Sequence, residues 1–118
     1  MLNKFANIQY VAENIREKFE QRQIPNKELA KLYSEYNPKV NKDVFITEAV
    51  KIFPKLNCGL TSIYLQQILG GELVWGKYNE HAHSFLLLDG NTIVDITADQ
   101  YGGPKVYVGR LEFPWSKN

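Results

Sequence analysis

Hydrophobic residues in the first half of the chain recur every three or four positions, as they do on one face of a helix. The first such stripe runs from about residue 4 to about residue 22 and comprises Phe5, Ile8, Val11, Ala12, Ile15 and Phe19. Pro25 ends this helix, and Asn26 is a suitable N-cap for a second one, which stops at Asn37-Pro38 because the residue before proline avoids helical dihedrals. The N-terminal part is therefore predicted to be helical.

Two further helices are predicted before the pattern changes. One runs from Asp43 to Phe53 and is stopped by Pro54. The other begins near Cys58 and ends at Gly70-Gly71, a pair suited to a C-terminal cap.

After Gly71 the pattern changes to the alternation that is typical of strands. Asp89-Gly90, followed by Asn91, indicates a hairpin turn. The predicted strands are residues 72–78, 82–88, 92–97 and 105–108. We therefore predict an α+β fold in which the helix that begins at Cys58 packs on a small antiparallel sheet.

Length and composition favour one globular domain. The chain has 118 residues, of which 44% are hydrophobic and 23% charged. We expect a single domain over residues 1–118, with a helical part at 1–54 and a core with the sheet at 55–118. The fourteen Lys and Arg are matched by thirteen Asp and Glu and are scattered, which argues against a nucleic-acid partner.

Targeting signals are not evident in the sequence. Residues 1–7 lack the apolar core of a signal peptide, and no stretch approaches eighteen apolar residues. One cysteine cannot form an internal disulfide, which favours a reducing compartment. We expect a cytoplasmic protein with no membrane partner, although a chain exported without a cleavable signal has the same pattern. The oligomeric state is not indicated.

The only cysteine, Cys58, lies at the predicted start of a helix. A thiol there is close to the positive end of the helix dipole and to unpaired backbone N–H groups, and both favour the thiolate. A thiolate is a ready nucleophile. A lone cysteine is, however, more often a small buried hydrophobic residue.

Two polar residues on the adjoining strands supply the partners that cysteine catalysis needs. His83 shares a strand face with Phe85, and Asp95 shares one with Ile93, so each is a polar group on an apolar face unless the two pair. A tight hairpin places them opposite or diagonal to each other. His81 lies on the same face as His83, which we prefer because it is further inside the strand.

Other residues near these positions have candidate roles. Asp99 is a reserve for Asp95. The side chains that are candidates to line a substrate groove are Trp75, Tyr78 and His81. His81 and His83, with a carboxylate and Cys58, form an alternative zinc site, although the chain has no other histidine.

Three segments resemble the core of the papain-like cysteine peptidase superfamily, closest to its transglutaminase-like and NlpC/P60-like branches. They are Asn57-Cys58-Gly59-Leu60-Thr61-Ser62, His81-Ala82-His83-Ser84-Phe85 and Ile93-Val94-Asp95-Ile96-Thr97-Ala98-Asp99-Gln100. The resemblance covers about residues 55 to 108. It departs from the families where Phe85 replaces a tryptophan common in transglutaminase-like proteins, and where residues 55–57 contain no upstream glutamine.

The resemblance implies a triad of Cys58 as nucleophile, His83 as general base and acid, and Asp95 as orienting group. In the absence of the glutamine, the backbone N–H of Cys58 is expected to bind the oxyanion, assisted by Asn57 or Gln100. The expected activity is hydrolysis or acyl transfer at an amide or peptide bond or a glutamine side chain, on a protein or peptide substrate and without a cofactor. Alternatives are a non-catalytic protein-binding domain with the same fold and a metal-binding protein that uses His81 and His83.

Overall fold

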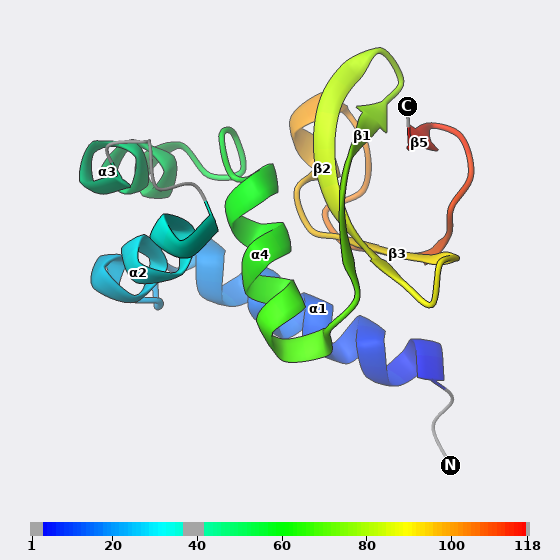
Figure 1. Cartoon of the computed structure of the whole chain (residues 1–118), viewed down its shortest axis with the longest axis horizontal. Helices are drawn as coiled ribbons and strands as arrows, with labels where there is room; N and C mark the ends of the chain where they lie inside the picture. The colour runs from blue at the N-terminus through cyan, green and yellow to red at the C-terminus, as the bar shows by residue number, and fades with distance from the viewer. Residues whose placement is uncertain (1–3, 37–41, 118) are drawn as a thin grey trace.

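The computed structural model describes residues 4–36 and 42–117. Within these ranges the chain begins with helices, in the order that the sequence predicts (Figure 1). Their bounds are α1 Lys4–Glu20, α2 Asn26–Tyr36, α3 Lys42–Ile52 and α4 Cys58–Leu69. The Asn37-Pro38 stop predicted for the second helix lies outside the described residues.

Local backbone geometry ends two of these helices. After α1, Arg22 has a φ of 54°, and the Gln23 N–H donates to the Lys18 carbonyl, as in a left-handed cap. After α4, Gly70 has a φ of 74° and its N–H donates to the Gln66 carbonyl. The chain can therefore turn directly from α4 into the sheet.

The sheet is antiparallel, with strand order β4-β3-β2-β1-β5. Its strands are β1 Glu72–Tyr78, β2 His81–Leu88, β3 Thr92–Asp95, β4 Tyr107–Arg110 and β5 Trp115–Ser116. The predicted α+β fold is confirmed.

Three predictions for the sheet were inaccurate. The fourth strand lies at Tyr107–Arg110 instead of 105–108, and the third ends at Asp95 instead of residue 97. The 3₁₀ helix η1, Ala98–Tyr101, follows the third strand. Strand β5 was not predicted, because two residues are too few for an alternating pattern.

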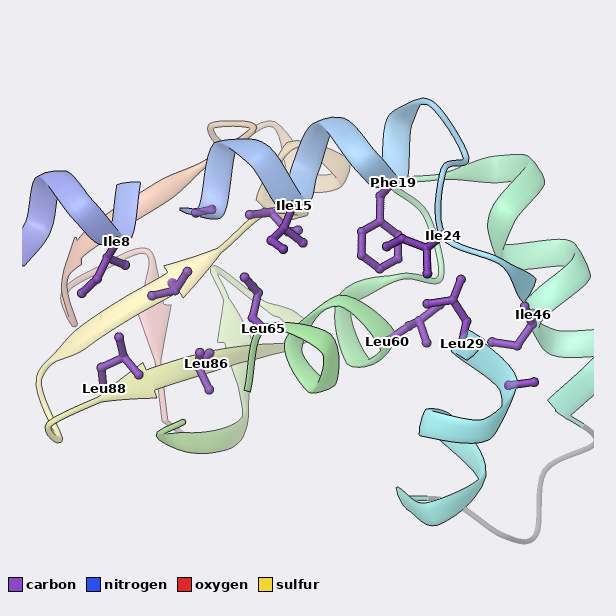
Figure 2. Packing of buried hydrophobic residues seen from close by; sticks show 14 residues of the cluster. Ile8, Ile15, Phe19, Ile24, Leu29, Ile46, Leu60, Leu65, Leu86 and Leu88 are labelled. Atoms are coloured by element: carbon purple, nitrogen blue, oxygen red, sulfur yellow. The ribbon is translucent and has the colours of Figure 1, made fainter. Parts of the chain in front are cut away.

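One face of the sheet is covered by helices. Figure 2 shows the buried cluster that fills this layer; it runs from the sheet past α1 and α4 to α2 and α3. We call it the helix-side cluster, and its buried members are Ile8, Ala12, Ile15, Phe19, Ile24, Leu29, Ala30, Ile46, Leu60, Leu65, Leu86, Leu88, Val94 and Ile96. The helical part and the sheet thus share one core.

The opposite face of the sheet carries a smaller cluster, which we call the site-side cluster. Its buried members are Val74, Tyr78, Phe85, Leu87, Ile93, Ala98 and Trp115. In Figure 1 the segment between β4 and β5 lies on the far side of the sheet from α4. His83 and Asp95 have the same strand parity as Phe85 and Ile93, so they belong to this face.

Candidate active site

Cys58 is the first residue of α4 and is partly exposed. Asn57 precedes it at the N-cap position but makes no side-chain cap hydrogen bond. The first N–H groups of the helix therefore receive no cap from that side chain, and the positive end of the helix dipole lies at the thiol.

His83 and Asp95 form a buried pair. The distance from Nε2 of His83 to Oδ2 of Asp95 is 2.6 Å, and both side chains are almost completely excluded from water. Strands β2 and β3 pair Leu87 with Ile93, and extending this register places the histidine diagonal to the carboxylate. The structure thus brings together the two residues in the way that strand alternation predicts.

The Asp95 carboxylate accepts further hydrogen bonds from both sides. Its Oδ1 accepts the backbone N–H of Thr97 at 2.9 Å, and its Oδ2 accepts the indole Nε1–H of Trp115 at 2.8 Å. Hydrogen bonds of this kind favour the charged form of a buried carboxylate. Trp115 lies on β5, so the last described strand contributes directly to the pair.

The Cys58 thiol interacts with His83 and with both the backbone and the side chain of Ser84. Nε2 of His83 is committed to Asp95, so Nδ1 is the ring nitrogen that remains for the thiol; it is buried and has no hydrogen-bond partner among the described residues. Strand β2, which carries His83, therefore also contacts the Cys58 sulfur through the next residue, Ser84.

These contacts shift both pKa values towards an ion pair. Burial alone raises the pKa of Cys58, but the contacts with His83 and Ser84 outweigh it and lower that pKa below the thiol's usual 9.0. Burial alone lowers the pKa of His83, but the hydrogen bond to Asp95, the contact with Cys58 and the negative charges of both raise it to about 9. Both shifts favour an ion pair of thiolate and imidazolium.

Aromatic rings surround the His83 imidazole. The rings of Tyr78 and Tyr101 contact it edge-on, with centroids 6.3 and 5.4 Å away. Tyr78 is 7% exposed and belongs to the site-side cluster, so it is a core residue and not part of a groove. His81 is exposed and stacks on Tyr101 with centroids 4.5 Å apart.

Trp75 differs from the other groove candidates, because 59% of its surface is exposed. It lines a pocket of about 370 Å³ together with Cys58, Gly76, Lys77, Ala82, His83 and Ser84. Two hollows on the described surface that are larger or equal lie away from the thiol, among the helices, and a smaller one of about 310 Å³ lies beside the end of α4. The nucleophile candidate thus opens onto a pocket of its own.

The two side chains predicted to assist in binding the oxyanion have different hydrogen-bond environments. Asn57 is fully buried and its side-chain amide donates to the carbonyls of Ala49 and Lys55, at 2.9 and 2.7 Å. That amide fixes the loop before α4 and is not offered to a substrate. Nε2 of Gln100 is buried and has no hydrogen-bond partner among the described residues.

Asp99, the reserve for Asp95, has a different partner. Its two oxygens accept hydrogen bonds from Nη1 and Nη2 of Arg16 on α1, at 2.7 and 2.9 Å. The same guanidinium donates to the Ile96 carbonyl at 2.8 Å and lies over the Phe53 ring. Arg16 is 6% exposed, so this ion pair fastens α1 to the segment that follows Asp95.

The zinc alternative finds no support in the positions of these side chains. Within residues 4–36 and 42–117, no three His, Cys, Asp or Glu side chains are arranged to hold a metal ion. His81 stacks on Tyr101 while His83 binds Asp95.

Sequence reasoning missed three contributors to the site. Ser84 follows His83 directly, so the role predicted for His83 was the signal that could have identified Ser84 as part of the site. Trp115 lies on a strand too short to be recognised, and Tyr101 lies in a 3₁₀ turn. Their contacts with Asp95 and His83 arise from tertiary packing.

None of the helices over the described residues has the length and apolar character needed to cross a membrane.

No significant match to the chain was found among curated proteins or among solved structures. A family model described as YunG protein matches residues 53–113, a segment that contains Cys58, His83 and Asp95 but ends before Trp115. Because this match spans more than half of the 118 residues, the chain belongs to the YunG protein family.

Proposed function

We propose that this protein is a cysteine-dependent hydrolase or acyltransferase that acts on an amide or peptide bond or on a glutamine side chain. The observation that carries the proposal is the continuous series of contacts from Cys58 through His83 to Asp95, next to an open pocket. The proposal includes the resemblance to papain-like cysteine peptidases, a protein or peptide substrate, no cofactor and a cytoplasmic location.

In this reaction the Cys58 thiolate attacks the carbonyl carbon, and the carbonyl π electrons move to the oxygen. When the tetrahedral intermediate collapses, the C–N bond breaks and the amine leaves with a proton from His83. The acyl group is then a thioester on Cys58. Water or an acceptor amine attacks it while His83 takes the attacking group's proton, and the thiolate is released.

The buried Asp95 carboxylate contributes to this cycle through its contact with His83. Asp95 keeps one imidazole nitrogen hydrogen-bonded, which fixes the ring's orientation and stabilises the imidazolium. The aromatic rings around His83 keep water from this hydrogen bond, and a dry environment strengthens it.

The first test is the pH dependence of iodoacetamide labelling. Cys58 is the only cysteine, so labelling of the intact protein reports this thiol alone. We expect a midpoint clearly below 9.0, the thiol's ordinary pKa, and a shift back towards it in His83→Ala. Slow labelling that is indifferent to His83→Ala would count against the catalytic role.

The second test separates hydrolase from acyltransferase. With p-nitrophenyl acetate we expect a burst of nitrophenolate equal to the enzyme concentration and an acetyl group on Cys58 by mass spectrometry. Cys58→Ala should abolish the burst. Faster turnover on addition of a primary amine would identify an acyltransferase. The absence of both burst and adduct in the folded wild-type protein would favour the non-catalytic binding domain.

A further inference from the structure

The pocket next to Cys58 has a floor of small side chains. It is formed across the paired strands β1 and β2, where Gly76 lies opposite His83 and Trp75 opposite Ser84. A Cβ at position 76 would collide with the Ser116 carbonyl oxygen and crowd the Phe85 ring, so only glycine fits there. Gly76, Ala82 and Ser84 are small residues of the lining, and they leave room for a substrate next to the sulfur.

Two side chains of β1 rise beside this floor. Trp75 and Lys77 are separated by two positions, so they lie on the same face of the strand, and both are exposed. An indole that is 59% exposed next to a nucleophile offers a flat apolar surface to a ligand. The Lys77 ammonium offers a positive charge on the same side.

Lys77 forms no ion pair with any described residue. Of the acidic groups nearby, Glu72, at the start of β1, lies 3.9 Å from Lys117, and Asp95 is buried against His83. Glu80, in the turn after β1, forms no ion pair with Lys77. The described residues that line the pocket include Lys77 and His83 but neither Asp nor Glu. His83 is neutralised by Asp95, so Lys77 is the lining cation whose charge no described side chain balances, and such a charge attracts anions and raises their local concentration.

We infer that this pocket selects acyl donors that carry a carboxylate near the scissile carbonyl, with Lys77 as its counter-charge and Trp75 as the apolar wall. The inference rests on the proposed function, because it takes Cys58 as the nucleophile. Amides or peptides with an acidic side chain or a terminal carboxylate next to the cleaved bond belong to this class. Neutral and basic donors lack the partner for Lys77.

Two alkylating reagents of nearly equal size test this without knowledge of the natural substrate. Iodoacetate is anionic and iodoacetamide is neutral; with either one, a bond forms from Sγ of Cys58 to carbon and iodide leaves. The ratio of their rate constants cancels any change in the thiolate population. We expect Lys77→Gln to lower the iodoacetate-to-iodoacetamide ratio about three- to tenfold, as expected for the loss of one unit charge nearby in a partly solvated pocket.

Control variants make the result specific. Lys31→Gln, on α2 and outside this pocket, should leave the ratio unchanged, and Lys77→Arg should retain it. The Lys77 effect should also shrink as salt is added. Equal ratios in the wild type, Lys77→Gln and Lys31→Gln would overturn the inference. Labelling of the wild type by iodoacetamide with an ordinary thiol midpoint would instead contradict the proposed function, so the two failures are distinguishable.

Discussion

Leu86 and Leu87 are consecutive residues of β2 and are almost equally buried, yet they point to opposite sides of the sheet. Leu86 belongs to the helix-side cluster, where the described neighbours are apolar residues of α1, α4 and the sheet. Leu87 belongs to the site-side cluster, which is smaller, rich in aromatic rings and contiguous with His83 and Asp95. One strand thus contributes to the helix-covered core on one side and to the surroundings of the His83–Asp95 pair on the other.

The two sides of the sheet differ in what constrains the geometry of their side chains. The helix-side cluster gains free energy simply from the apolar area it removes from water. The site-side cluster also excludes water, but it contains a buried carboxylate whose oxygens need His83, Thr97 and Trp115 as donors. Its geometry is therefore constrained by hydrogen bonds as well as by packing.

The largest expected effect comes from truncating these two leucines. Each change to alanine should lower the free energy of unfolding by about 2–5 kcal/mol, with Leu86→Ala nearer the upper end because its larger cluster collapses less readily around a cavity. Urea unfolding of both variants and the wild type measures this. If Leu87→Ala were the more destabilising, the two sides would not differ as we describe.

The pH dependence of stability sharpens the comparison. The pKa of His83 is raised from 6.5 to about 9, so its contribution is complete below pH 6.5 and is lost as the pH rises to about 9. The lowered pKa of Cys58 acts oppositely: its contribution grows as the pH rises towards the unfolded value of 9.0. Where folded Cys58 is already a thiolate, the two trends cancel and the wild-type stability is nearly independent of pH.

Removing the thiol reveals the pH dependence of stability that His83 contributes on its own. In Cys58→Ala, Asp95 still raises the pKa of His83, so stability should fall above pH 6.5 with a slope of up to about 1.4 kcal/mol per pH unit. Urea unfolding between pH 6 and pH 9.5 measures this slope. The double variant Cys58→Ala, His83→Gln should show no such slope. Parallel curves for the wild type and Cys58→Ala would mean that thiol and imidazole do not form an ion pair.

A smaller effect is expected at the tryptophans. Trp115→Phe keeps an aromatic ring against Tyr78 and Tyr107 but removes a donor from the buried Asp95 carboxylate, which should cost about 1–3 kcal/mol. Trp75→Phe, at an exposed position, is the matched control and should change stability by less than about 0.5 kcal/mol. Thermal unfolding of both variants distinguishes them, and equal shifts would argue against a structural role for the indole N–H.

Local patterns predicted most of the fold. The spacing of Ile8, Ile15 and Phe19 places α1 correctly, and the change to alternation after Gly71 places β1 and β2. The errors lie where local pattern is weakest: strand β5 has two residues, and η1 interrupts what alternation extends as a strand.

The site was predictable where it depended on neighbouring strands. The pairing of His83 with Asp95 follows from a hairpin register, since a polar residue on each apolar face requires a partner. The roles of Trp115 and Arg16 depend on segments distant in sequence, which packing brings together and no short pattern records. For the same reason Asp99, plausible as a substitute for Asp95, is instead the partner of α1.

The chain's two tryptophans lie on different sides of the nucleophile, one exposed at the pocket and one buried against the carboxylate. Indole fluorescence responds to solvent polarity and is quenched by a nearby protonated imidazole. In Trp75→Phe the remaining emission comes from Trp115 and follows the charge of His83; in Trp115→Phe it comes from Trp75 and follows occupancy of the pocket. The protein thus contains two intrinsic optical probes, one for proton transfer and one for ligand binding, that need no attached dye.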